Sequence, residues 1–463
     1  HGPVEIHGAA ATSHVALVGA APAGTTTLTL DQTPVGWRAG DQIVIAGAVE
    51  GGDQDEVRTI EAIVGNQVLV SPLSYHHTPP RPDLQVHVAH LTRNAIFESE
   101  ADDVARRGHV MFMHNRNVAI DYGGFYSLGR TDKLQPVNDP VVDSAWNLLP
   151  GTGTNPRARY AVHFHRNGVS RTGSPATVHG TVAVDATSWA FTNHSSYVEM
   201  TDNVAYQSRG AGFVTEVGDE IGLFHGNIAI DAIGSGEDDD SRVDIQDFGH
   251  AGDGFWFQGT AISVRDNIAT DADGAAFVFY TRGLKEGSNV APPVQASNLL
   301  DPSLAGGADT ILVDHVPLEA FENNVGYASA VGMTVRYHVR DAFHNQQSVF
   351  ANSTFWNNDV GLRIPYTQES IFENLDIFYR HGTYPQFGVF TNGVTKDITF
   401  NDLSVRGYSW GITAARAGYT QINGGLLQNR QNIVIRPATE PGRPVEGNGQ
   451  IRFIKLPAIA GIA

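Results

Sequence analysis

Residues 202–216 carry the pattern that decides the fold: Asp202-Asn203-Val204-Ala205-Tyr206-Gln207-Ser208-Arg209-Gly210-Ala211-Gly212-Phe213-Val214-Thr215-Glu216. An Asn opens a short apolar strand, a turn follows, and a second strand begins with Gly-Phe. The pattern recurs from about residue 105 onward, and several Asn anchors are 22 to 27 residues apart. This period predicts the coils of a parallel β-helix, in which each Asn hydrogen-bonds its equivalents above and below. The other anchors are Asn227, Asn267, Asn324, Asn352, Asn374 and Asn401.

We therefore predict an all-β chain with almost no α-helix. A right-handed parallel β-helix is expected over residues 105–463, and a β-rich domain over residues 1–104 is expected to cap it. Short β-rich runs divided by Gly, Asp and Asn turns, such as Gln42-Ile43-Val44-Ile45 and Gln67-Val68-Leu69-Val70, support the first domain. We expect the protein to be a monomer.

The repeat also predicts which side chains point outward. From Asn203 to Glu216 is 13 residues, and from Asn267 to Tyr280 is also 13, so the second strands can be aligned without regard to their chemistry. Side chains alternate between the two faces of a strand, and neighbouring strands lie about 4.8 Å apart. The last residue of each aligned set then forms one outward column: His165, His194, Glu216, Gln258 and Tyr280.

Two long departures from the repeat are expected to rise beside this column. The acidic insertion from Gly236 to Asp253 brings Asp240 to the column by the same count of residues. Residues 281–322, with Arg282, Lys285 and Glu286, are expected to form a loop that walls a groove.

The composition excludes several classes of partner. The net charge of -19 argues against nucleic acid and anionic membranes. The chain has no Cys, so disulfides and thiolate chemistry are excluded. No apolar run approaches the roughly 20 residues of a membrane span. We expect a secreted or cell-surface protein, whose leader would lie upstream of His1.

The stretch Arg159-Tyr160-Ala161-Val162-His163-Phe164-His165-Arg166 places two histidines on one face of a strand. Two or three histidines and a carboxylate are a common ligand set for a divalent metal. We take His163, His165, His194 and Glu216 as catalytic residues and as metal ligands, with Zn²⁺ or Ca²⁺ and no organic cofactor. Metal-free acid–base catalysis by histidine and a purely structural ladder of polar side chains stay open.

Residues around the histidines are expected to bind a sugar chain. Arg159 and Arg166 suit a uronate carboxylate, with salt bridges to nearby aspartates as the alternative. Trp256 is expected to be an exposed platform for a sugar ring, unless the 281–322 loop covers it. The full set of expected substrate-binding residues is Arg159, Tyr160, Arg166, Trp256, Gln258 and Tyr280.

Several of these motifs resemble a known family. Trp37-Arg38-Ala39-Gly40-Asp41-Gln42-Ile43-Val44-Ile45 is similar to the G8 domain, a β-rich module named for its glycines. The stretch from Arg159 to His165 resembles Gly-Arg-Tyr-Pro-x-His-Phe-His of the family of the cell-migration-inducing hyaluronan-binding protein (CEMIP) and its transmembrane relative. Here Ala158 and Ala161 replace the Gly and Pro. The likeness covers roughly residues 1–280, and implies a G8 domain, a parallel β-helix and hyaluronan-type degradation. We expect a bacterial member that acts on another polysaccharide.

We therefore expect an extracellular enzyme that cleaves a glycosaminoglycan or uronate-type glycan. A glycoside hydrolase is preferred, with Glu216 as the acid and Asp219, Glu220 or Asp253 as its partner. A polysaccharide lyase is the alternative, with His165 or His194 as the base and an arginine or metal neutralising the uronate. A non-catalytic carbohydrate-binding β-helix is the third possibility.

Overall fold

The computed structural model describes residues 2–282, 293–392, 394–435 and 449–460. Within these ranges the chain consists of β-strands and short 3-10 helices, and no α-helix occurs. The predicted all-β class, a parallel β-helix with a β-rich N-terminal domain, is confirmed. His1, Lys285 and Glu286 lie outside the described residues. In the described part of the chain, no helix is long and apolar enough to span a membrane.

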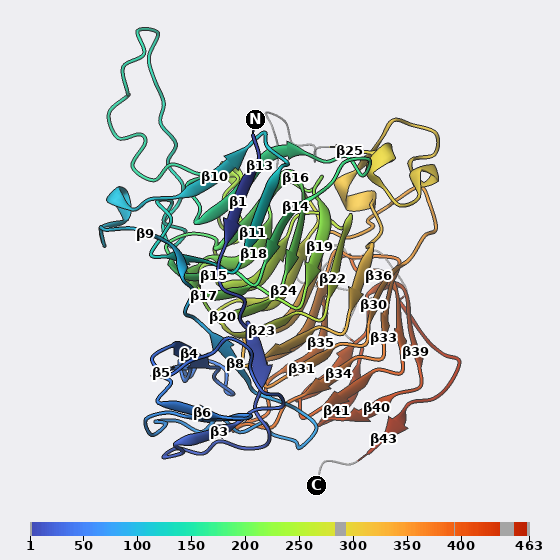
Figure 1. The fold of residues 1–463 in the computed structure, drawn as a ribbon. Coiled ribbons are helices and arrows are strands. Elements are labelled where there is room, and N and C mark those ends of the chain that lie inside the picture. Colours follow the sequence, from blue (N-terminus) through green and yellow to red (C-terminus); the bar gives the residue numbers. More distant parts are fainter. Residues whose placement is uncertain (1, 283–292, 393, 436–448, 461–463) are drawn as a thin grey trace.

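The β-helix consists of coils whose strands stack in parallel into three sheets (Figure 1). One of them carries the His-x-His strand, and we call it the histidine sheet. Its strands are β10 (Val110–Met113), β13 (Val162–Gly168), β16 (Phe191–Thr201), β18 (Ala211–Thr215), β21 (Asp253–Phe257), β24 (Ala275–Tyr280), β29 (Val331–Arg336), β32 (Val360–Pro365), β35 (Phe387–Asn392), β38 (Trp410–Thr413) and β41 (Gln431–Val434).

The second sheet follows the histidine sheet in each coil, and the long strand β16 takes part in both. Its other strands are β1 (Val4–His7), β11 (Val118–Asp121), β14 (Ala176–His179), β19 (Ile221–His225), β22 (Ile262–Arg265), β27 (Ala320–Glu322), β30 (Ser348–Ala351), β33 (Ser370–Glu373), β36 (Lys396–Asn401), β39 (Ala417–Asn423) and β42 (Gln450–Phe453).

The third sheet closes each coil. It consists of β9 (Ala95–Glu98), β12 (Gly123–Tyr126), β15 (Val182–Ala186), β17 (Val204–Arg209), β20 (Ile228–Ile233), β23 (Ile268–Ala272), β28 (Val325–Tyr327), β31 (Thr354–Trp356), β34 (Asp376–Phe378), β37 (Ser404–Arg406), β40 (Leu426–Gln428) and β43 (Ala458–Ile459).

Four of the seven asparagines predicted from the repeat stack at the corner between the second and third sheets. Asn352, Asn374 and Asn401 do not join them, because Ser353 takes the next position and accepts from the N–H of Asn324 at 3.1 Å. The side-chain oxygen of Asn227 accepts from the main-chain and side-chain N–H groups of Asn203, at 3.0 and 2.9 Å. Asn267 and Asn324 continue the same ladder, with side-chain contacts of 2.9 and 3.1 Å. All four are buried. The ladder satisfies main-chain groups that the sharp turns would otherwise leave unpaired inside the protein.

Stacked aromatic rings fill the interior of the coils. Phe191, Phe213, Phe255 and Phe277 occupy one position on successive coils, with ring centroids 5.0, 4.8 and 4.9 Å apart. Each is fully buried, as predicted for the core-facing residue of the repeat. Rings at this spacing add pairwise attraction to the burial of apolar area, and so they fix the register between coils.

The N-terminal domain packs against the outer face of the third sheet. Its core joins that of Val204, Ile228, Ile268 and Trp356. The domain has two antiparallel sheets, one of β2 (His14–Ala16), β8 (His87–His90), β4 (Gln42–Ile45) and β5 (Glu56–Thr59), and one of β3 (Thr27–Thr29), β7 (Gln67–Leu69) and β6 (Ala62–Val64).

The expected boundary at residue 104 does not separate the two parts cleanly. Strand β1 pairs with β11 in the second sheet, and β9 pairs with β12 in the third sheet. The β-helix thus takes its first strands from both ends of the segment that was assigned to the N-terminal domain. The boundary was misplaced because β1 pairs with a strand more than a hundred residues away, and no local sequence pattern indicates such a pairing.

Three excursions leave the coils near the histidine sheet. Residues 127–161 include an arm closed by the bridges Asn138–Asn155 and Val142–Leu148, seen projecting in Figure 1. Residues 234–252 form the acidic insertion. The described part of 281–319 holds the hairpin of β25 (Pro293–Gln295) and β26 (Thr310–Leu312). The 3-10 helices are η1 (Val104–Arg106), η2 (Val243–Ile245), η3 (Ala296–Asn298), η4 (Pro302–Ala305) and η5 (Val313–His315).

The ladder makes a testable contribution to stability. Replacement Asn227→Ala should destabilise the protein by about 3 kcal/mol, because it leaves buried groups of Asn203 and Met200 without partners. Asn401→Ala is the control, since Asn401 is partly exposed and its side chain bonds the side chains of Glu373 and Asn423 near the surface. That variant should lose less than about 1 kcal/mol. Denaturant unfolding measures both, and equal losses would contradict the role given to the buried ladder.

Candidate active site

The pairing of β13 with β16 brings the histidines together. Val162 pairs with Phe191, His163 with Thr192, and His165 with His194. Next along the sheet, Asn193 pairs with Thr215, and the N–H of Glu216 donates to Asn193 O at 3.0 Å. The register predicted from the 13-residue count is therefore confirmed, and His165, His194 and Glu216 lie on consecutive coils.

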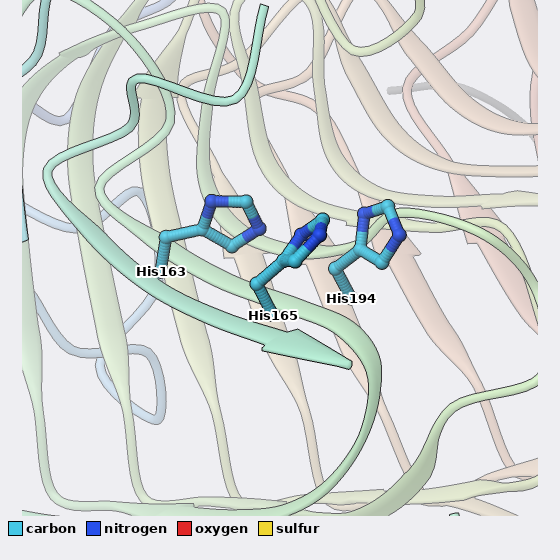
Figure 2. A group of neighbouring side chains, drawn as sticks. All are labelled: His163, His165 and His194. Atoms are coloured by element: carbon cyan, nitrogen blue, oxygen red, sulfur yellow. The ribbon is translucent and has the colours of Figure 1, made fainter. Parts of the chain in front are cut away.

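The three imidazole rings stand side by side on the outer face of the sheet (Figure 2). Ring centroids are 4.4 Å apart for His165 and His194, 5.1 Å for His163 and His165, and 5.8 Å for His163 and His194. One ring nitrogen from each residue lies within 4.8 Å of one from each of the others. His163 is fully buried and His194 nearly so, whereas His165 is partly exposed. Solvent therefore meets the cluster at His165.

Glu216 lies behind the rings and orients them. Its Oε2 accepts from Nδ1 of His194 at 2.6 Å and lies 3.7 Å from Nε2 of His163. Its Oε1 accepts from the hydroxyl of Tyr160 at 3.0 Å. The Nδ1 of His163 in turn donates to the carbonyl oxygen of Ala158 at 3.3 Å. These bonds occupy Nδ1 of His163 and His194 and direct the Nε2 atoms of both rings to other partners.

Glu216 was expected to be a metal ligand and the general acid, and its surroundings favour a supporting role behind the histidines instead. Its carboxylate is not among the groups whose ligand atoms converge, because it is held by His194 and Tyr160 instead. Burial alone would raise the pKa of Glu216, but the charges and hydrogen bonds of His194, His163 and Tyr160 outweigh it and lower the pKa to about 2. A carboxylate in this state has no proton to donate at neutral pH.

The histidines differ in their protonation. The pKa of His163 is lowered to about 3 and that of His165 to about 4, mainly by burial and also by the neighbouring histidines, against the opposing charge of Glu216. Burial also acts to lower the pKa of His194, but the charge and hydrogen bond of Glu216 raise it overall. At neutral pH, His163 and His165 are therefore neutral, and His194 forms an ion pair with Glu216.

Two excursions are locked together beside the cluster. Lys133, from the 127–161 excursion, donates to Asp247 of the acidic insertion at 2.5 Å, and both side chains are buried. Arg242 contacts the second oxygen of Asp247 at 3.1 Å. Lys133 also lies 4.2 Å from the ring of Trp189, which packs on Tyr160. The lock thus holds Tyr160 against Glu216.

Comparison with known proteins matches this region to a family. The profile described as CEMIP beta-helix matches residues 149–333, which include all three histidines and Glu216. The resemblance to the G8 and CEMIP β-helix family is confirmed. A G8 domain-containing protein of Dictyostelium discoideum is 28% identical over 195 residues, which cover 41% of this chain and 15% of the relative. A second from the same organism is 26% identical over 201 residues, covering 41% of this chain and 12% of the relative.

The chain thus spans less than a sixth of the length of these two G8 relatives. Solved structures offer only a loose likeness. A family 28 exopolygalacturonase of Yersinia enterocolitica is 8% identical with a TM-score of 0.36, covering 96% of this chain and 99% of that one. The catalytic domain of a GH87 α-1,3-glucanase is 10% identical with a TM-score of 0.37, covering 97% and 98%. Likenesses at this level show the fold and say nothing about the chemistry of this chain.

Four of the six expected substrate-binding side chains are buried: Tyr160, Trp256, Gln258 and Tyr280. Trp256 has no exposed surface, because Phe248 of the acidic insertion and Tyr280 stack against it. It is therefore not the exposed platform that was expected. Tyr280 is also fully buried and donates to Asp240 at 2.9 Å, and Gln258 is 1% exposed. The outward column predicted from the repeat is present, but the acidic insertion covers it at Tyr280.

Tyr160, Arg159 and Arg166 have different surroundings near the histidine cluster. Tyr160 is buried and holds Glu216, so it is a positioning residue. The guanidinium of Arg159 donates to the carbonyl of Arg157 at 3.2 Å, which gives it a main-chain partner of its own. Arg166 is exposed and its charge acts on His165 and His194. Of the two arginines, Arg166 is the one that we place at the open side of the site.

Asp219 was predicted only as a possible partner of Glu216, and the structure places it beside the histidine cluster on a partly exposed surface. Its Oδ1 accepts from Ser195 at 2.9 Å, and it lies close enough to His194 for the charge of His194 to act on it. Burial raises its pKa. Glu220, in contrast, is buried and accepts main-chain N–H groups of Ser195, Val217 and Gly218, so it fixes the turn.

The ion pair of Glu216 predicts a pH dependence of stability. The folded pKa of about 2 is below the unfolded value of 4.5, so the stabilisation is complete above pH 4.5 and is lost as the pH falls toward 2. In EDTA, Glu216→Gln should be less stable than wild type by about 2–3 kcal/mol at pH 6, and the gap should shrink below pH 4. Glu199→Gln, at a partly exposed position where β16 runs in the second sheet, controls for loss of one charge. Unfolding midpoints between pH 3 and 7 measure this, and a gap that is constant with pH would contradict the ion pair.

Proposed function

We propose that this chain is the catalytic part of a polysaccharide-degrading enzyme, and that His163, His165 and His194 hold a divalent metal at its reacting centre. The observation that carries the proposal is the convergence of three imidazole nitrogens within 4.8 Å on an outward face. The family resemblance adds the expected substrate class, a glycosaminoglycan or uronate-type glycan.

The chemistry of the donor set fits a metal. Nε2 of His163 and Nδ1 of His165 are buried and have no hydrogen-bond partner among the residues that the structure describes. An unpaired buried polar atom costs free energy, so such atoms call for a partner. His163 and His165 are neutral at pH 7, which is the protonation state that binds a metal. His194 would lose its Nε2 proton to a metal at the site, while its Nδ1–H keeps the bond to Glu216. Three nitrogen donors suit Zn²⁺, and Ca²⁺ prefers oxygen ligands, so we favour Zn²⁺ here.

The residues around the donors support this assignment. Metal-binding histidines usually donate their other N–H to a carboxylate or carbonyl group, which fixes the ring and increases its basicity. His194 does so to Glu216, and His163 does so to Ala158 O. Tyr160 in turn fixes Glu216. A bound Zn²⁺ would supply Lewis acidity toward a sugar oxygen, a water molecule or a uronate carboxylate.

Two reactions fit the open side of the site. In hydrolysis a proton must reach the leaving oxygen, and Asp219, with its raised pKa and partial exposure, replaces Glu216 as the donor. In β-elimination the uronate carboxylate must be neutralised, and Arg166 beside His165 supplies positive charge. We retain hydrolysis as the preferred reaction because Asp219 is a partly exposed carboxyl group near His194 whose pKa is raised by burial.

Digestion of a panel of uronate-containing and neutral glycans tests the proposal. His165→Ala should reduce cleavage to background, and Glu216→Gln should reduce it about 10–100-fold because it disturbs a residue behind the ligands. His179→Ala is the control, since His179 lies on β14 of the second sheet and bonds Tyr122 and Thr201. It should retain activity. Chelation should mimic His165→Ala, and added Zn²⁺ should restore the wild type.

The same digestion separates the two reactions. An unsaturated uronate absorbs ultraviolet light and would identify a lyase, whereas new reducing ends without that absorbance identify a hydrolase. Full activity of His165→Ala and Glu216→Gln would contradict the site. Loss of activity in both variants without any chelator effect would contradict the metal and leave acid–base chemistry by the same residues.

A further inference from the structure

Two tyrosines stand on the histidine sheet several coils away from the histidine cluster. Tyr337 follows β29 and Tyr366 follows β32. Their rings stack with centroids 5.1 Å apart and planes 13° from parallel. The main-chain N–H of Tyr337 donates to the carbonyl oxygen of Pro365 at 3.3 Å, which holds the two residues at one position of adjacent coils. We call this pair the tyrosine platform.

The platform is in line with the open side of the histidine cluster. Arg166 and Ser195 each follow a histidine of the outward column, and Tyr337 and Tyr366 occupy the equivalent position further along the sheet. All four have left-handed backbones, with φ between 46° and 61°. Neighbouring coils are about 4.8 Å apart, so the five steps from β16 to β32 place Tyr366 about 24 Å from Ser195. A sugar chain that reacts at the histidines and follows the sheet would reach the platform.

The backbone at the platform is unusual for its side chains. Left-handed φ suits Gly, Asn and Asp, whereas a bulky aromatic residue there is strained, and such strain is found mostly at functional positions. Both tyrosine rings are partly exposed. Neither hydroxyl has a hydrogen-bond partner among the described residues, and neither is fully buried. Tyr337 and Tyr366 therefore present their hydroxyl groups to solvent.

Two arginines add positive charge to the platform. Cζ of Arg336 lies 5.1 Å from the ring centroid of Tyr337 and 6.0 Å from that of Tyr366. Cζ of Arg282 lies 5.3 Å from the centroid of Tyr337. The two arginines differ in their partners, because Arg336 is paired with Asp240, whereas Arg282 has no ion pair among the described residues. Arg282 thus offers an uncompensated charge in a chain whose net charge is -19.

We infer that Tyr337, Tyr366 and Arg282 form a distal subsite for an acidic polysaccharide, which rests on the proposed function of the histidine cluster. The C–H face of a sugar ring packs well against an aromatic side chain, and a guanidinium group pairs with a carboxylate or sulfate group. The stacked tyrosines suit the sugar ring, and Arg282 suits the acidic group that the ring carries. A neutral glycan would gain from the rings but not from Arg282.

Binding of glycans to the full chain in a His165→Ala background tests the subsite without cleavage. Calorimetry compares long chains of hyaluronan and of polygalacturonate, which can span about 24 Å, with short oligosaccharides of each, which cannot. A neutral β-glucan is the third polymer. At least one acidic polymer should bind more tightly than its short oligosaccharides. Tyr366→Ala should weaken that polymer about 10-fold and leave the short oligosaccharides unchanged. Arg282→Gln should also weaken the acidic polymer, and should leave the neutral one unchanged.

Tyr384→Ala is the matched control. Tyr384 is 36% exposed, and Cζ of Arg430 lies 4.7 Å from its ring centroid, so it too is a surface tyrosine beside an arginine. It precedes β35, whereas the platform lies where the strands of the histidine sheet end. This variant should bind every glycan as the parent does. Tyr366→Phe keeps the ring and should retain most of the affinity, and thermal melting of Tyr366→Ala checks that it is folded.

Equal binding of long and short acidic chains by the parent would overturn the inference. Unchanged polymer affinity in a folded Tyr366→Ala would do the same, as would a gain from Tyr366 that is confined to the neutral polymer. With His165 intact, Tyr366→Ala should raise KM for the acidic polymer about 10-fold and leave kcat unchanged. A wrong assignment of the histidines would alter only this cleavage result, because the binding comparison needs no cleavage.

Discussion

The parallel register between β13 and β16 is the constraint on which the rest of the site depends. It is fixed by main-chain hydrogen bonds between neighbouring strands and by stacked phenylalanines in the interior of the coils. A shift of one residue would turn His165 and His194 into the core and Phe164 toward solvent. Because one face is packed with apolar groups, such a shift is prohibitively unfavourable. The histidines are thus held by the same forces that form the β-helix.

Most buried charged groups around the histidines have a partner that compensates their loss of hydration. Glu216 is 4% exposed, and it is ionised because His194 and Tyr160 compensate its desolvation. Lys133 and Asp247 are buried as a pair with Arg242. A buried ion pair contributes little net stability, but separating its two charges inside the protein costs several kcal/mol. These residues therefore specify one arrangement of the two excursions. One ring nitrogen of His163 and one of His165 are buried without a partner among the described residues, and these two atoms point to a bound ion.

The repeat predicted the coils, the Asn ladder and the outward column, because these depend on periodicity along the chain. It did not predict what covers the column. Trp256 and Tyr280 are buried under Phe248, whose position depends on how the acidic insertion folds back. The role of Glu216 depended on its side-chain rotamer and on Tyr160, 56 residues away, and neither follows from spacing. The pairing of β1 with β11 was missed for the same reason, since it joins distant segments.

The central claim is that the three histidines bind a transition metal. X-ray diffraction from crystals of the protein grown with Zn²⁺, recorded on both sides of the zinc absorption edge, tests it most directly. The account predicts one strong anomalous peak among His163, His165 and His194, with zinc–nitrogen distances of about 2.0–2.1 Å. Glu216 should lie outside the ligand sphere and keep its bond to His194. A histidine cluster without an anomalous peak at saturating Zn²⁺, or a peak bound by other residues only, would contradict the claim.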